Sequence, residues 1–148
     1  MLLDLSGGSE MSVMSASHTY VVPDPLEQAL RSIRGALDKM ELDVVGEIEL
    51  SEHVKQASER RMTGSRILLV GCPILDLEAV ALGRAAAVFV PLHVLVSAER
   101  NETRVSVVNP TGLFDARFPI GARGPIDKLV ARFAMAMDSI APAGNHAM

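Results

Sequence analysis

The chain has 148 residues, the length of a single domain. Apolar residues make up 49% of it and charged residues 22%, so it is able to bury a core and is too apolar for an intrinsically disordered protein. A net charge of -4, with no Trp, one Tyr and four Phe, argues against a nucleic-acid partner, because binding to a duplex needs a basic surface.

Residues 1–12 have no basic region followed by a sustained apolar run, so they do not resemble a secretory signal, and we expect a flexible tail. No later segment reaches the roughly 18 uncharged apolar residues that a membrane-spanning helix needs. The chain has one Cys, which cannot form an internal disulfide. These features predict a cytoplasmic protein with no membrane partner.

The predicted single domain covers residues 13–141 and opens with a strand over residues 14–22. A helix follows, in which we expect Asp24 to cap the N-terminus and Pro25 to occupy the first position. Apolar side chains at steps of three and four residues place one stripe along this helix. They are Leu26, Leu30, Ile33, Leu37 and Met40.

Segments rich in Val, Ile and Leu occupy the middle of the chain and predict strands. They span Asp43–Leu50, Arg66–Gly71, Val88–Val96 and Thr103–Val108. The polar residues 97–102 between the last two indicate a hairpin. Shorter helices fit Ser51–Arg61 and Asp76–Ala87.

The last helix is predicted to begin at Gly124–Pro125 and to end before Pro142, again with one apolar face. Residues 142–148 are expected to form a second flexible tail. Two amphipathic helices and a mainly antiparallel set of strands predict an α+β fold, a two-layer sandwich of one sheet covered by these helices.

Alternation along Val88–Val96 places Val90, Leu92 and Val94 on the core face and puts Pro91 and His93 on the other. Because proline has no N–H to donate to a neighbouring strand, Pro91 predicts a bulge or an edge position. His93 is therefore expected near a distorted strand, on the face away from the core.

Three motifs follow one another at strand boundaries: Val70-Gly71-Cys72-Pro73, Val90-Pro91-Leu92-His93 and Val107-Val108-Asn109-Pro110. This pattern resembles the domain of unknown function family 302, over residues 14–140. The Glu52-His53 pair is similar to an Asp-His pair that recurs in that family's short helix. The resemblance implies a compact α+β fold, often seen as a dimer, with no established reaction. At Cys72 and His93 the family pattern most often has Asn and a basic residue instead.

The first functional hypothesis is a homodimeric binding module. Its cleft is expected near the turn after Cys72 and the strand that carries Pro91 and His93, and it would hold a small ligand or a partner. The ligand-binding candidates are His53, Cys72, Pro73, Pro91, His93 and Asn109.

The alternative is an enzyme, or a redox or metal protein, in which Cys72 acts with His53 or His93. Thiolate and imidazole are ligands of zinc, copper and iron. However, the three residues are about twenty positions apart and lie on different predicted elements, which is not the spacing of a metal motif. We therefore expect no metal site, and the sequence identifies neither a cofactor nor a catalytic residue. A purely structural role is the third possibility.

Overall fold

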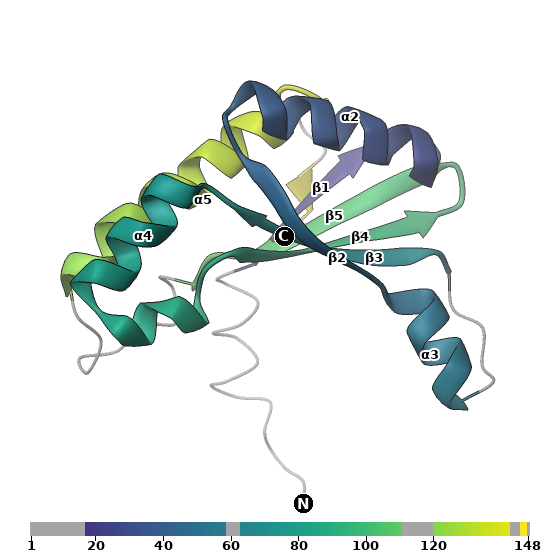
Figure 1. Ribbon diagram of the computed structural model, residues 1–148. Helices are drawn as coiled ribbons and strands as arrows, with labels where there is room; N and C mark the ends of the chain where they lie inside the picture. The colour runs from purple at the N-terminus through teal and green to yellow at the C-terminus, as the bar shows by residue number, and fades with distance from the viewer. Residues whose placement is uncertain (1–16, 59–62, 111–119, 143–145, 148) are drawn as a thin grey trace, which may run out of the picture.

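The computed structural model describes residues 17–58, 63–110, 120–142 and 146–147 (Figure 1). The elements in chain order are β1 (Ser17–Val22), α2 (Leu26–Lys39), β2 (Asp43–Glu49), α3 (Leu50–Ser58), β3 (Ser65–Gly71), α4 (Pro73–Leu82), the 3-10 helix η2 (Arg84–Val88), β4 (Leu92–Glu99), β5 (Glu102–Val108), α5 (Ile120–Asp138) and β6 (His146–Ala147).

Within the described residues, all strands join one antiparallel sheet in the order β2-β3-β4-β5-β1-β6. β1 and β2 follow each other in the chain but lie far apart in the sheet, because α2 carries the chain across the sheet between them. β4 and β5 form the predicted hairpin, with Glu99 opposite Glu102.

Helices α2 and α5 lie against the same face of the sheet, and α4 packs on α5 (Figure 1). The alternation of β4 follows from this arrangement, since Leu92, Val94 and Val96 are buried under the helices and His93 is exposed on the other face. The fold is the two-layer α+β sandwich that the sequence predicts. We call the face without α2 and α5 the open face.

The core fills the space between the sheet and these two helices. Ile33 and Leu37 come from α2, Phe133 and Met137 come from α5, and all four are fully buried. The ring of Phe133 meets that of Tyr20 edge to face, with 6.3 Å between ring centroids. Burying one large apolar side chain of this kind contributes about 1.5–3 kcal/mol, so this layer stabilises the packing of the two helices on the sheet.

Three predicted helix starts are wrong. α4 begins at Pro73, three residues before the predicted Asp76, and it ends at Leu82, before the separate 3-10 helix η2. Pro25 itself is the N-terminal cap of α2, with no side-chain capping bond, and Asp24 belongs to the preceding turn, where its carbonyl accepts a hydrogen bond from the Thr103 hydroxyl. α5 begins at Ile120 and includes Pro125 within the helix. Its first residues carry no apolar stripe, so periodicity could not reveal them.

β4 begins at Leu92, four residues later than predicted, directly after a cis Val90–Pro91 peptide bond. The predicted bulge or edge position at Pro91 is wrong. β4 is a central strand between β3 and β5, and Pro91 precedes its first paired residue, so no ladder N–H is missing. The described irregularity lies instead in β2, between Val44 and Gly46.

The predicted tail of residues 1–12 lies outside the described residues. In the predicted tail of residues 142–148, His146 and Ala147 form β6 and pair with Tyr20 and Thr19 of β1. Among the described helices, none is both long and apolar enough to cross a membrane.

Candidate functional site

The open face carries a row of side chains that crosses five strands. The strand register aligns Ile48 of β2 with Ile67 of β3, then with Leu95 of β4, Ser106 of β5 and Thr19 of β1. The two hydroxyl groups at the end of the row lie 3.2 Å apart and share a hydrogen bond. A sheet face exposed to water usually carries polar residues, so the apolar part of this row is unusual.

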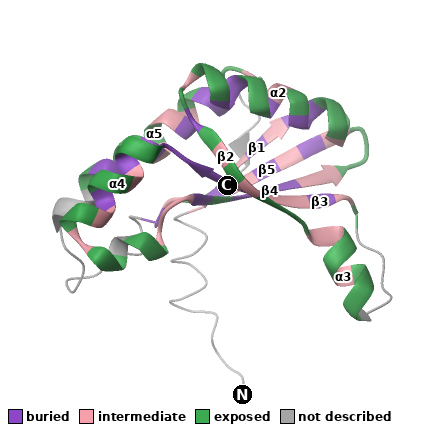
Figure 2. Cartoon of the chain, viewed as in Figure 1, coloured by how far each residue is buried: buried purple, intermediate pink, exposed green. Residues whose placement is uncertain are grey.

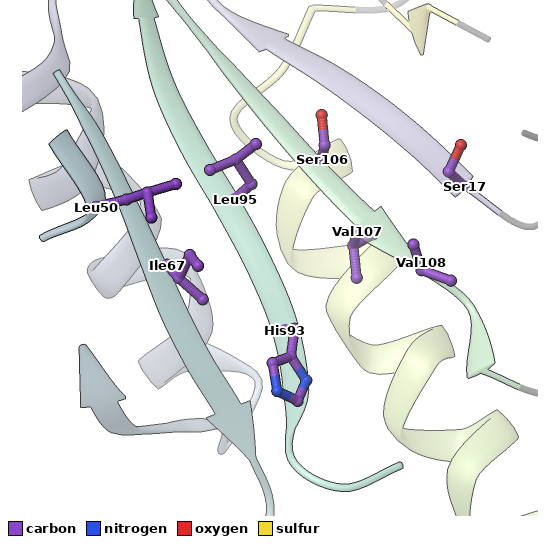
Figure 3. A pocket seen from close by; sticks show the side chains of 8 residues that line it. All are labelled: Ser17, Leu50, Ile67, His93, Leu95, Ser106, Val107 and Val108. Atoms are coloured by element: carbon purple, nitrogen blue, oxygen red, sulfur yellow. The ribbon is translucent and has the colours of Figure 1, made fainter. Parts of the chain in front are cut away.

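A hollow of about 290 Å³ lies over this row, and we call it the His93 hollow (Figure 3). Its lining residues are Ser17, Leu50, Ile67, His93, Leu95, Ser106, Val107 and Val108. The side chains of Ile67, Leu95 and His93 come from neighbouring strands and share this surface, while Leu50 enters from the start of α3. The lining is mostly apolar, and its polar side chains are the imidazole of His93 and the hydroxyl groups of Ser17 and Ser106, each of which can donate or accept a hydrogen bond.

Cys72 occupies a second hollow, on the helical side of the sheet. Its side chain is 6% exposed, and its sulfur accepts a hydrogen bond from Nη1 of Arg132 at 3.6 Å. This Cys72 hollow has a volume of about 320 Å³ and is lined by Glu41, Cys72, Pro73, Ile74, Leu75 and Arg132. Cys72 and Pro73 therefore lie together, and His93 lies on the other face of the sheet.

Asp76 holds the start of α4 against the end of β3. Its backbone N–H donates to the carbonyl of Cys72 at 2.8 Å, and its carboxylate accepts a hydrogen bond from the backbone N–H of Cys72. The Oδ1 atom is buried without a partner among the described groups. Burial raises the pKa of Asp76 and the charge of Asp43 adds to this effect, against the lowering by the hydrogen bond from Cys72.

Replacing Asp76 with Asn is expected to change the free energy of unfolding more favourably at neutral pH than in acid. The folded pKa of Asp76 is raised above its ordinary 3.8, so the stability linked to its proton is present below pH 3.8 and is lost as the pH rises through the folded value. Asn keeps the acceptor oxygen without the charge. Urea denaturation of both proteins at about pH 3.5 and pH 7 measures the difference.

The pKa of Glu47 is shifted in the opposite direction, because its hydrogen bond with Arg34 lowers it. Since the wild type and Asp76→Asn both contain Glu47, its contribution cancels when their free energies of unfolding are compared. If Asp76→Asn changed the free energy of unfolding less favourably at pH 7 than at pH 3.5, the conclusion that burial raises the pKa of Asp76 would be contradicted.

The structure does not bring His53, Cys72 and His93 together. His53 is exposed on α3, which leaves the sheet beside Arg66 at the start of β3, whereas Cys72 follows the end of that strand. No group of three or more His, Cys, Asp and Glu residues in the described part of the chain is arranged to hold a metal ion.

The remaining candidates fall at strand ends. Pro91 is half-buried just before β4, and Asn109 is half-buried just after Val108 at the end of β5. The candidates thus do not share one cleft: Cys72 and Pro73 line one hollow, His93 lines another on the opposite side of the sheet, and the other three candidates line neither.

Sequence reasoning placed Leu95 with His93 on the face of β4 away from the core, and it missed the contribution of β3 to the lining of the His93 hollow. Ile67 lies in a compact apolar run, in which the face away from α2 and α5 could not be told from the core face. The apolar pattern on both faces of β3 was the available signal. Arg132, which contacts Cys72 from sixty positions away, had no sequence signal at all.

Comparison with known proteins gives a family and a fold. Residues 18–140 match the family described as domain of unknown function DUF302. A crystal structure of an uncharacterized conserved DUF302 protein from Bacillus stearothermophilus is similar, with a TM-score of 0.76 and 17% sequence identity over 84% of this chain and 98% of that chain. At this identity the likeness concerns the fold alone. No curated protein matches the chain.

Proposed function

We propose, from the premise that the chain belongs to the DUF302 family, that it is a homodimeric binding module which holds a small apolar ligand on the open face of its sheet. The observation that carries this proposal is the His93 hollow on a sheet face that α2 and α5 leave uncovered. The family description names no reaction, so the proposal rests on the surface itself.

The size and lining of the hollow support a small-molecule ligand. Ligand sites have volumes of about 300–1,000 Å³, apolar walls and a few polar groups that fix the orientation of the ligand. The His93 hollow, at about 290 Å³, lies at the small end of this range. The matching ligand is an apolar molecule with one polar group placed to meet the imidazole of His93, which can donate or accept a hydrogen bond.

The unpaired thiol of Cys72 supports a cytoplasmic location as part of the proposal, since reducing compartments keep thiols free. We assign no catalytic role to Cys72, because its described side-chain partner is Arg132 and neither His53 nor His93 lies in its hollow.

Binding of a neutral apolar fluorophore, N-phenyl-1-naphthylamine, tests the site. We expect saturable binding to the wild type, and Leu95→Glu is expected to weaken it by at least about tenfold, since a carboxylate in an apolar hollow must be desolvated. Met135→Glu is the matched control, because Met135 is 59% exposed on α5 and lies outside the His93 hollow. Its affinity should stay within about twofold of the wild type.

Equal affinities for the wild type and Leu95→Glu would remove the proposed site, as would an equal loss in Met135→Glu. Light scattering tests the second part of the proposal. A homodimer has twice the mass of the 15.8 kDa chain, and a single-chain mass at micromolar concentration would contradict it.

A further inference from the structure

We propose that the ligand site is completed by a second copy of this chain, whose α3 lies across the His93 hollow and closes it. This inference rests on the proposed homodimeric binding function and names the surface through which the two copies meet. In it the hollow of each copy is one half of a site, and the α3 helix of the partner supplies the other half.

The hollow of a single copy is too shallow to be a complete site. Small-molecule sites typically bury about 70–90% of the ligand surface. The His93 hollow is bounded by the sheet beneath it and by Leu50 at one side, and α2 and α5 lie behind the sheet (Figure 3). A ligand resting on this face would keep its outer side in water unless something covers it.

Few contacts between described residues hold α3 in place, and one of them is the hydrogen bond that the backbone N–H of Ser65 donates to the hydroxyl of Ser51 at 3.4 Å. The helix has nine residues and projects from the end of β2, away from the two layers of the fold (Figure 1). Helices shorter than about 12–15 residues are marginal in water without packing. Of the other described elements, α3 packs mainly on β3, and its described residues are exposed or half-buried (Figure 2).

The sequence of α3 nevertheless has an apolar side. Leu50, Val54 and Ala57 follow at steps of four and three residues, while Glu52 and Lys55 lie elsewhere on the helix. Leu50 and Val54 are half-buried and Ala57 is exposed. The apolar side of α3 thus becomes more exposed from Leu50 to Ala57, and it is suited to contact another apolar surface.

α3 and the hollow belong to one continuous surface, because Leu50 is both the first residue of the helix and part of the hollow. Two copies related by a two-fold axis between their open faces place each α3 on the hollow of the other. Such an interface is self-complementary, as the two-fold relation requires. The lining of the hollow contains no Asp, Glu, Lys or Arg, so this approach brings no like charges together there.

The area is sufficient for a stable dimer. Five strands about 4.8 Å apart and about seven residues long give an open face of roughly 500 Å². One side of a nine-residue helix adds roughly 130 Å². Full contact of the open face and of one side of α3 in both copies would bury at most about 1,260 Å², at the lower end of the roughly 1,200–2,000 Å² found in specific interfaces. A second copy can cover the hollow without any other partner.

The first arm of the test compares two variants that each add one negative charge to α3, on opposite sides of the helix. Val54→Glu places a carboxylate on the apolar side, and Gln56→Glu, the control, adds the same charge at an exposed position on the opposite side. We expect Val54→Glu to shift the protein to single chains by light scattering and to weaken binding of N-phenyl-1-naphthylamine by at least about tenfold. Gln56→Glu should change neither.

The second arm detects the contact directly. Chains carrying Ala57→Cys are mixed in air with chains carrying Val108→Cys, so that dissolved dioxygen accepts the two electrons and two protons released by each new disulfide. A disulfide between these two positions can form only between two copies. We expect a covalent dimer at least about tenfold faster in the mixture than with either variant alone, because docking raises the local thiol concentration. The wild type, whose Cys72 is buried, is the oxidation control.

The outcomes separate this inference from the proposed function. A dimer that binds the fluorophore, resists Val54→Glu and gives no cross-link between positions 57 and 108 would overturn the inference and leave the homodimeric module standing. A single chain that binds the fluorophore would overturn both the inference and the homodimer. Failure of the wild type to bind the fluorophore would count against the proposed ligand site, whatever the state of the interface.

Discussion

Replacing Phe133 with alanine is expected to lower the free energy of unfolding by about 3–5 kcal/mol. Phe133 is 1% exposed, lies in the main core and contacts the ring of Tyr20 from the sheet. The shorter side chain leaves a cavity between α5 and the sheet and removes this aromatic contact. Urea denaturation followed by circular dichroism measures the loss.

Met135→Ala on the same helix is the matched control. Met135 is 59% exposed on the outer side of α5, so its truncation should change the free energy of unfolding by no more than about 0.5 kcal/mol. Similar losses in the two variants would mean that α5 does not present Phe133 to the sheet, and the two-layer account would fail.

Replacing Gly71 with alanine is expected to cost about 1–3 kcal/mol through overpacking. A Cβ atom at this position would overlap Oδ2 of Asp76 and would lie 3.3 Å from Cβ of Pro91. The carboxylate of Asp76 is fixed there by its hydrogen bond from Cys72, so it cannot move aside without losing that bond. Glycine at position 71 therefore makes room for the contact that starts α4.

A double-mutant cycle tests that cause. Asp76→Ala removes the obstructing carboxylate, so Gly71→Ala should cost at least about 1 kcal/mol less in that background than in the wild type. Additive effects of the two substitutions would show that the cost at Gly71 has another origin.

Periodicity predicted most of the fold because it records which side of each element is buried. The stripe of α2 and the alternation of β4 both face the core in the structure, and His93 lies on the opposite face as the alternation indicates. Features set by backbone geometry were not predictable in this way. Pro25 as the cap of α2 and the early start of α5 leave no trace in an apolar pattern.

The candidate site was predictable only in part. Alternation placed His93 and Leu95 on the face of β4 away from the core, but Ile67 lies in an apolar run whose two faces cannot be told apart until the positions of α2 and α5 on the sheet are known. The partner of Cys72 depends on the packing of α5 against the start of α4, a long-range contact that local spacing does not encode.

Methyl NMR of the wild-type protein, recorded while N-phenyl-1-naphthylamine is added, tests most directly whether the open face is the binding surface. The largest shifts are predicted for the methyl groups of Ile67, Leu95 and Val108, which line the His93 hollow. Ile74 and Leu77 on α4 are the internal controls, because they are apolar, about 70% exposed and outside that hollow. Shifts confined to Ile74 and Leu77, with Ile67, Leu95 and Val108 unchanged, would contradict the account.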